Sequence, residues 1–263
     1  MIILKLGGSL LTNKEKKFSI NRRVLKRIAS EIKACEEENG KKLVVVHGGG
    51  AFGHPLAKEY ELNKGYISKS QIKGIALTRK AMQDFNNLVV KEFIDQGINA
   101  IALQTSAIVT CENREIKSFN HEVVERFLEL GLTPVLYGDV VLDDKLKFCI
   151  LSGDRIITHL AKILNPGRIV LATDVDGVFD KNPKKYKDAK LIEKITPEIF
   201  KRNKLNFESY ANDVTGGIEY KVRELLSLAK LGYNTIIINA KIRGRLKKAL
   251  LGHEVVGTRI EGE

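Results

Sequence analysis

Short apolar runs alternate with longer segments of helical spacing along most of the chain. The apolar runs are rich in Val, Ile and Leu and lack internal alternation, which is typical of strands covered on both faces in a parallel sheet. The segments between them repeat apolar residues every three or four positions, as amphipathic helices do. We predict strands at 2–6, 43–46, 98–103, 133–137, 168–173, 234–238 and 255–260, and the longer helices at 21–38, 70–96, 120–130, 155–164 and 213–231.

Two further pairs of short strands predict hairpins, one at 108–111 and 115–117 and the other at 140–142 and 146–150. The order of strands and helices is typical of the α/β class. Because the chain has no repeat, low-complexity tract or linker, we predict one unit over 1–263 with two lobes, at about 1–165 and 166–263.

A glycine-rich stretch follows the strand at 43–46 and contains Gly48, Gly49, Gly50 and Gly53, with His54 and Pro55 at its end. Glycines remove side chains where backbone must bend or approach another group closely. We expect a helix to begin after them, so that its unpaired N–H groups favour an anion in the turn.

The first strand leads into a second turn of this kind, Gly7-Gly8-Ser9, which also suits a phosphate. Lys5 is the one charge inside that apolar strand, where an ammonium is costly unless it meets an anion or reaches solvent at the strand end.

The amino-acid composition limits the classes of molecule that the protein is expected to bind. The formal net charge is +12, but the lysines are dispersed and aromatic residues make up only 6%, which favours small anionic substrates or a lysine-rich surface of the thermophile type over nucleic acid. The three cysteines are scattered without a CxxC pair, so we expect neither disulfides nor a zinc site. No apolar stretch approaches the roughly 20 residues of a membrane span, and we expect a cytoplasmic protein without membrane partners.

Gly48-x-Gly50-x-x-Gly53 formally matches the dinucleotide-binding fingerprint. The next predicted strand is too distant for that motif and ends without an acidic residue, which argues against a nicotinamide cofactor. The common GxxxxGK[ST] loop is absent. Glycine clusters at 7–8, 48–50 and 216–217, with lysines at 5, 14, 181 and 221, instead predict phosphoryl transfer, which depends mainly on positioning and charge neutralisation.

Five ordered segments carry a family resemblance, and they are Lys5-Leu6-Gly7-Gly8-Ser9, His47-Gly48-Gly49-Gly50, Ser152-Gly153-Asp154, the run from Thr173 to Phe179, and Asp213-Val214-Thr215-Gly216-Gly217 with Lys221. They resemble the amino acid kinase superfamily over nearly the whole chain. The resemblance implies an open αβα sandwich around a mainly parallel twisted sheet, ATP with Mg²⁺, and a homodimer. It further implies that the N-terminal lobe binds the acceptor and the C-terminal lobe the nucleotide.

Within the superfamily, the segment from Gly50 to Pro55 is most similar to the isopentenyl phosphate kinases of archaea. That resemblance implies isopentenyl phosphate as acceptor, with His54 holding its phosphate, and isopentenyl diphosphate and ADP as products. Fosfomycin kinases share the histidine, and a non-catalytic nucleotide or anion sensor has the same fold, so both stay open. Arg155 departs from the acidic residue expected after Ser-Gly-Asp.

The resemblance implies roles for individual residues. The expected catalytic residues are Lys5, Lys14, His54 and Asp154. The nucleotide would be bound by Lys5, Gly7, Gly8, Ser9, Gly50, Asp174, Gly177, Val178, Gly216, Gly217 and Lys221. The acceptor phosphate would be bound by Gly49, Gly50, Gly53, His54 and Gly153, and the apolar tail by Met82, Val140 and Ile150. No residue is expected to ligate Mg²⁺ directly, since no carboxylate cage is visible.

Simpler roles compete with several of these assignments. His54 in isolation is typical of a helix-capping or surface histidine, and His47, at the end of a buried strand, of a structural one. Asp154 precedes a helix and could be only its N-cap. Met82, Val140 and Ile150 could each serve core packing alone.

Overall fold

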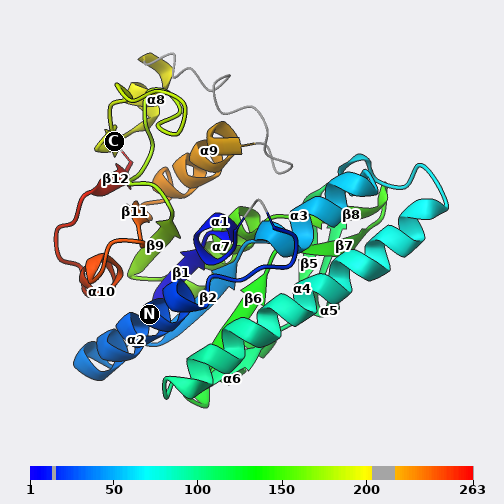
Figure 1. Ribbon diagram of the computed structural model, residues 1–263, viewed down its shortest axis with the longest axis horizontal. Coiled ribbons are helices and arrows are strands. Elements are labelled where there is room, and N and C mark those ends of the chain that lie inside the picture. Colours follow the sequence, from blue (N-terminus) through cyan, green and yellow to red (C-terminus); the bar gives the residue numbers. More distant parts are fainter. Residues whose placement is uncertain (14–15, 203–216, 263) are drawn as a thin grey trace.

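Both halves of the chain contribute strands to the main sheet of the molecule. A computed structural model describes residues 1–13, 16–202 and 217–262 (Figure 1). Within them the sheet contains, from edge to edge, β10 (Lys194–Ile195), β12 (Gly257–Ile260), β11 (Thr235–Asn239), β9 (Arg168–Thr173), β1 (Ile2–Leu6), β2 (Leu43–His47), β6 (Thr133–Tyr137) and β3 (Ala100–Ala102). Neighbouring strands pair parallel except β11 with β12. The predicted mainly parallel sheet is confirmed.

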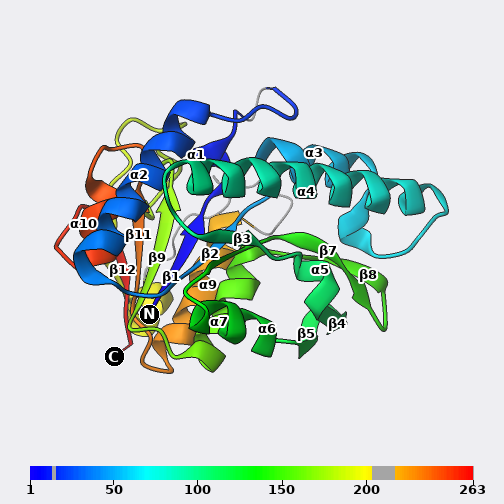
Figure 2. The same cartoon turned by 90° about the horizontal axis from the view of Figure 1, so that it is seen from below.

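Helices cover both faces of this sheet, which confirms the open αβα sandwich (Figure 2). One face carries α1 (Gly8–Leu11), α2 (Arg22–Asn39), α3 (Gly50–Glu59), α4 (Ser70–Asp95) and α10 (Arg245–Leu251). The other carries α6 (Glu122–Glu129), α7 (Gly153–Leu164) and α9 (Gly217–Ala229). The remaining helical segments are η1 (Leu62–Lys64), α5 (Thr105–Ile108) and α8 (Pro197–Arg202). Of these elements, β10, α1, α5, η1 and α10 were not predicted.

The two-residue period of a strand decides which way the side chains of β1 point. Ile2, Leu4 and Leu6 belong to the hydrophobic core under α2 and α4. Ile3 belongs to the core under α7 and α9. Lys5 therefore points toward the α7 face, and only 7% of it is exposed.

The two predicted hairpins are present and together form a second sheet. They are β4 (Val109–Glu112) with β5 (Glu115–Phe119), and β7 (Asp139–Asp143) with β8 (Lys147–Leu151). Parallel pairing of β4 with β7 joins them in the order β5-β4-β7-β8. This sheet lies beside α3 and α4 at one end of the molecule (Figure 1).

Helix α3 begins earlier than predicted. It starts at Gly50, inside the glycine-rich stretch, so that His54 and Pro55 are helical residues. Proline has no N–H for the carbonyl four residues before it, which here belongs to Ala51. The backbone N–H of Phe18 donates to that carbonyl at 3.0 Å and compensates for the missing bond.

The predicted helix at 21–38 corresponds to α2. Asn21 is its N-cap, because the Asn21 side chain accepts a hydrogen bond from the backbone N–H of Val24 at 3.2 Å. In the part of the chain that is described, no helix is both long and apolar enough for a membrane span.

Candidate active site

The strands β1, β2, β6 and β9 lie side by side and parallel, and the turns after them meet around one cavity. The crevice at the carboxyl ends of such strands is where open α/β sheets bind ligands. The glycine-rich turns after β1 and β2 supply one wall, and Gly138 after β6 and Asp174 after β9 extend it. The sequence of the turns therefore places backbone N–H groups at the site.

Two of the glycine turns touch each other through their backbones. A Cβ atom on Gly8 would lie 2.3 Å from the backbone nitrogen of Gly50, and one on Gly48 would lie 3.0 Å from that of Gly8. A side chain at Gly8 would force the two turns apart. Gly50 is buried at this contact and does not line the cavity, so its role in ligand binding stays a prediction.

Lys5 and Asp154 form a buried ion pair at the floor of the cavity. The Lys5 ammonium contacts Asp154 Oδ2, with side chains 8% and 10% exposed. Burial alone would raise the pKa of Asp154, but the charges of Lys5 and Lys221 outweigh it and hold that pKa below its usual value. The other oxygen, Oδ1, is buried without a hydrogen-bond partner among the described residues. It can accept a bond from a further cationic group.

Asp154 is not the N-cap of α7. Ser152 has that role, because its hydroxyl accepts a hydrogen bond from the backbone N–H of Arg155 at 3.2 Å. The carboxylate of Asp154 is thus available to the cavity, and the simpler capping interpretation is wrong.

Lys221, in the second turn of α9, lines the cavity on the side of Asp154. Gly217 and Ile218, in the first turn of the same helix, also line it. The side chain of Lys221 acts on the charge of Asp154, so Lys5 and Lys221 both contribute positive charge around one carboxylate. This arrangement suits phosphate groups.

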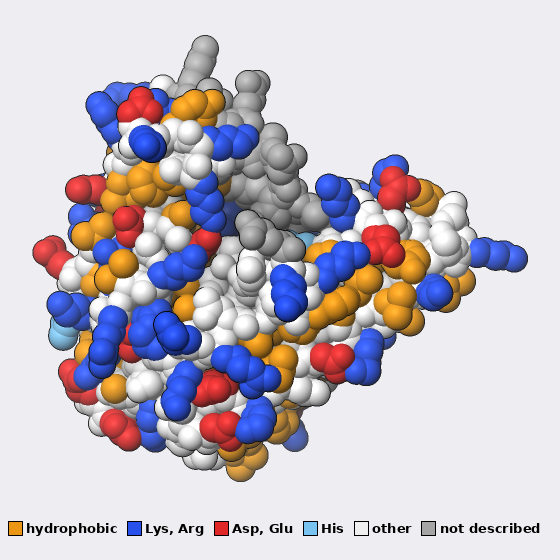
Figure 3. Space-filling model, in the orientation of Figure 1, with side chains coloured by type: hydrophobic (Ala, Val, Ile, Leu, Met, Phe, Trp, Pro, Cys, Tyr) orange, Lys and Arg blue, Asp and Glu red, His pale blue; other side chains and the backbone are white. Residues whose placement is uncertain are grey.

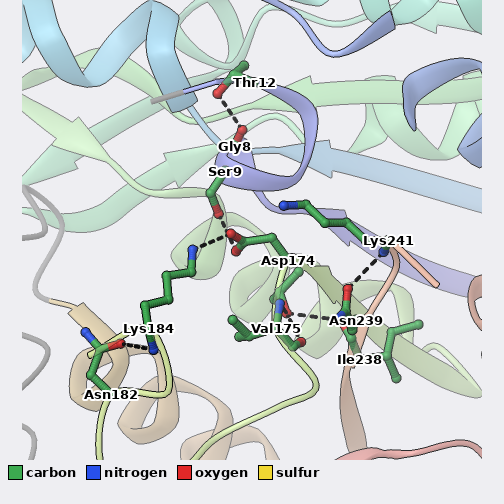
Figure 4. A network of polar contacts seen from close by, with 11 residues as sticks. Gly8, Ser9, Thr12, Asp174, Val175, Asn182, Lys184, Ile238, Asn239 and Lys241 are labelled. Atoms are coloured by element: carbon green, nitrogen blue, oxygen red, sulfur yellow. Dashed lines mark hydrogen bonds and ion pairs between the residues drawn. The ribbon is translucent and has the colours of Figure 1, made fainter. Parts of the chain in front are cut away.

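Asp174 forms a second polar group, shown in Figure 4. Ser9 Oγ donates to Asp174 Oδ1 at 2.9 Å, and Lys184 Nζ contacts Asp174 Oδ2 at 2.5 Å. Burial alone would raise the pKa of Asp174, but the hydrogen bond and charge of Lys184 lower it below the usual range. The carboxylate is therefore ionised at neutral pH and links the turns after β1 and β9.

His54 stands where the polar part of the cavity meets an apolar part. A Cβ on Gly49 would lie 3.0 Å from His54 Cδ2, so the imidazole lies over the first turn of its own helix. Beyond it the wall becomes apolar, with side chains from α3, α4, β7 and β8. These apolar residues are Ala57, Met82, Val140, Ile150 and Leu151.

His47 lies near the site without lining it. Its ring is fully buried between the rings of Phe85 and Tyr137, with centroid distances of 4.6 and 5.5 Å. The amide of Asn86 contacts Nε2 at 3.1 Å, and Nδ1 is 3.2 Å from the carbonyl of Gly48. The structure supports the structural role for this histidine.

The structure brings most of the predicted site residues to one cavity. Those that line it are Lys5, Gly7, Gly8, Ser9, Gly49, Gly53, His54, Met82, Val140, Ile150, Gly153, Asp154, Asp174, Gly177, Gly217 and Lys221. Val178 does not, because its side chain is in the hydrophobic core and its N–H donates to Thr258 Oγ1 at 2.8 Å. Lys14 and Gly216 lie outside the described residues.

Sequence reasoning missed other residues at the cavity. Asp139 lies two residues after the end of the predicted strand at 133–137, so the rule that ligands bind at carboxyl ends of strands could have found it. Thr78 lies one helical turn before Met82 and shares its face, which helical spacing also shows. Lys184 lies ten residues after Asp174 in the same connection and was also missed, because no local pattern predicts that this connection folds back to bring the Lys184 ammonium to the Asp174 carboxylate.

A direct protein site for a metal ion is absent from the described residues, where no three His, Cys, Asp or Glu side chains converge. The carboxylates of Asp154 and Asp174 are each engaged by lysine. The cavity is built for anions rather than for a bare cation.

A sequence profile of the amino acid kinase family matches residues 1–239. The chain belongs to the amino acid kinase family. Among the curated amino acid kinases that it matches, it is 42% identical to the isopentenyl phosphate kinase of Methanothermobacter thermautotrophicus, over 100% of both chains. It is 39% identical to that of Methanocaldococcus jannaschii, over 99% of this chain and 98% of the relative.

The fold is also similar to that of a solved structure. A crystal structure described as that of isopentenyl phosphate kinase superposes with a TM-score of 0.86 at 40% identity and covers 99% of each chain. Residues far apart in this amino acid kinase, such as Lys5, Asp154 and Lys221, therefore meet on a backbone that an experimentally determined relative shares.

Proposed function

We propose that the chain transfers the γ-phosphoryl group of ATP to isopentenyl phosphate, giving isopentenyl diphosphate and ADP. The observation that carries this proposal is the joining of two environments in one cavity. Glycine turns, lysines and His54 suit phosphate groups, and the pocket of Met82, Val140 and Ile150 suits a short hydrocarbon tail. The full-length identity to isopentenyl phosphate kinases supports the same acceptor.

The reaction needs no general base. A phosphate monoester has a second pKa of about 6 and is already an anionic nucleophile at neutral pH. The main obstacle is repulsion between the acceptor phosphate and the γ-phosphate, which ammonium groups and backbone N–H donors reduce. Lys5 and Lys14 would bridge the two phosphates, with Lys14 on the transferring group.

Asp154 would orient these lysines. It already contacts Lys5, and its free oxygen Oδ1 gives a second cation a place to bind. Lys221 would reach the phosphates of the nucleotide from α9. In this proposal the protein neutralises charge and aligns the oxygen and phosphorus atoms, while the acceptor attacks by itself.

The two substrates would divide the cavity. The acceptor phosphate would lie at Gly49, Gly53, His54 and Gly153, within the 1–165 part of the chain. The nucleotide would lie toward Asp174, Gly177, Gly216 and Gly217, in the 166–263 part. Ser9 and Lys5 lie at the junction, because β1 runs between the strands of the two halves.

Magnesium would enter with the nucleotide. The engaged carboxylates and the lack of a described acidic cluster do not fit a protein cage for Mg²⁺. Phosphate oxygens and water would therefore supply its ligands. The cytoplasmic location also stays a prediction.

An ATP-consumption assay with four acceptors side by side tests the function: isopentenyl phosphate, uridylate, fosfomycin and acetylglutamate. We expect turnover with isopentenyl phosphate far above the others. Preference for fosfomycin would move the chain to the fosfomycin kinases, and ATP binding without consumption of any acceptor would favour a sensor. Either result overturns the proposal.

Two variants test the roles of site residues in the same assay. His54→Ala should mainly raise the KM for the acceptor, and Lys14→Ala should mainly lower kcat, since the first group binds and the second acts on the transferring phosphoryl. His253→Ala is the matched control, because His253 is exposed and does not line the cavity. Unchanged kinetics in both test variants would remove the site assignment.

We also propose a homodimer formed through α4. Ile72 and Leu77 on this helix are 59% and 39% exposed, and Figure 3 shows apolar side chains along it. Light scattering on the wild type and on Ile72→Glu tests this, with Leu130→Glu on another exposed apolar residue as control. A monomeric wild type would contradict it.

A further inference from the structure

Arg155 makes contacts from all three nitrogens of its guanidinium. Nε contacts the hydroxyl of Tyr220, Nη1 donates to the backbone carbonyl of Arg114, and Nη2 donates to Glu115 Oε1 at 2.7 Å. Glu224 Oε1 is 3.7 Å from Nε. The Arg155 side chain is 19% exposed, that of Glu224 20% and that of Glu115 75%, so the contacts with α9 are better shielded from water than the contact with Glu115.

These contacts join three separate parts of the molecule. Arg155 follows Asp154 in the first turn of α7, and Tyr220 and Glu224 are on α9. Arg114 belongs to the turn between β4 and β5, and Glu115 is the first residue of β5. Tyr220 directly precedes Lys221. One guanidinium therefore links the carboxylate-bearing helix, the second sheet and the lysine-bearing helix.

The turn that Arg155 contacts is itself firmly held. The Asp143 carboxylate accepts hydrogen bonds from the backbone N–H groups of Asn113 at 3.1 Å and Arg114 at 2.7 Å. The Arg114 side chain also donates to the carbonyl of Asn63 at 2.7 Å. Arg155 thus connects α9 to an anchored part of the second sheet.

Arg155 does not act on the cavity directly. It does not line the cavity, and the charges that lower the pKa of Asp154 come from Lys5 and Lys221. The charged groups facing the guanidinium are Glu115 and Glu224, which balance it. Arg155 therefore does not set the pKa of Asp154, although it follows Asp154 in the sequence. Its contacts with α9 indicate a different role.

We propose that Arg155 is a positioning residue, which holds the first two turns of α9 and so keeps Lys221 aligned with Asp154 for the nucleotide phosphates. A planar guanidinium fixes several partners at once, which a lysine cannot do. Loss of these contacts frees the helix segment that carries Lys221. Because a misplacement of about 1 Å at a reacting group can cost roughly 100-fold, the site needs such support.

This inference rests on the proposed function in one respect, that ATP is the nucleotide. The experiment distinguishes failure of the proposed function from failure of the role of Arg155. Binding of ATP with Mg²⁺ to the full chain is measured by calorimetry without acceptor, followed by kinetics with isopentenyl phosphate. If the wild type does not bind ATP, the proposed function fails. If the wild type binds ATP and the Arg155 variants bind it equally well, only this inference fails.

The main variant is Arg155→Met, which keeps the apolar stem and removes the guanidinium. We expect its Kd for ATP to rise roughly tenfold, while the KM for the acceptor changes by less than about twofold. Arg155→Lys, which keeps the charge without the fork, should give an intermediate Kd. The control is Arg126→Met on α6, an exposed arginine paired with Glu122, which should leave ATP binding unchanged.

Tyr220→Phe removes the hydroxyl from the same contact, and it keeps the test available if Arg155→Met does not fold. It should raise the Kd for ATP in the same direction, and the double variant should be no weaker than Arg155→Met alone, since the two side chains act through one contact. The proposal is overturned by ATP affinity equal to wild type in both variants, by additive effects, or by an equal rise in the acceptor KM.

Discussion

The buried imidazole of His47 makes stability depend on pH in a defined window. Burial lowers the pKa of this group from 6.5 to about 4. Asn86 Nδ2 also donates to the carbonyl of Val135 at 3.2 Å, which identifies that nitrogen as a donor. Nε2 of His47 is then an acceptor, and the proton of the neutral ring is on Nδ1, toward the Gly48 carbonyl.

The sign and the magnitude of this pH effect on the free energy of unfolding follow from the linkage between proton binding and folding. Between pH 6.5 and 4 the unfolded chain binds a proton that the folded chain does not, so acid destabilises the fold. The contribution is complete above pH 6.5, and it is lost as the pH falls toward the folded pKa. Because a tenfold change in proton affinity corresponds to about 1.4 kcal/mol, the whole effect is about 3 kcal/mol, of which about 2 kcal/mol is lost between pH 7 and 4.5.

Urea unfolding at several pH values between 7 and 4.5 measures this loss. The comparison is between wild type, His47→Gln and His253→Gln, where His253 is exposed. Carboxylates titrate in all three proteins, so the difference in slope isolates His47. We expect wild type and His253→Gln to lose about 2 kcal/mol more than His47→Gln over this window.

Parallel slopes for wild type and His47→Gln would refute the reasoning. If His47→Gln does not fold, an NMR titration of the wild type serves instead. The imidazole signals of His47 should then show no protonation above pH 5, and a midpoint near 6.5 would be equally decisive against the argument.

Three further predictions concern the turns and the cavity. Gly8→Ala should abolish measurable ATP binding by calorimetry, because its Cβ would lie 2.3 Å from the Gly50 nitrogen; unaltered binding would contradict the contact. Asp143→Asn should lower the free energy of unfolding by about 2 kcal/mol, because its carboxylate accepts four backbone N–H bonds, whereas the exposed Asp144→Asn should change it little in the same urea titration. Ile150→Ala should lower the KM for phosphates with longer apolar tails, and a uniform change for all tail lengths would place the tail elsewhere.

Local features of this protein were readable from residue patterns. The Val-rich run before Gly48 predicted a buried strand, and the apolar spacing over 21–38 predicted a helix, and both are present. These features depend on interactions within a few residues, which the chain order itself specifies. The alternation along β1 likewise assigns Lys5 to one face.

The assembly of the site depended on contacts between distant segments. Ser9 and Asp174 are 165 residues apart, and Lys184, ten residues after Asp174, reaches the same carboxylate only because the connection between β9 and β10 folds back on itself. The pairing of β4 with β7, the start of α3 at Gly50 and the partners of Arg155 are of the same kind. Spacing along a chain specifies which face of an element is apolar, but side-chain packing in three dimensions decides which faces and loops meet.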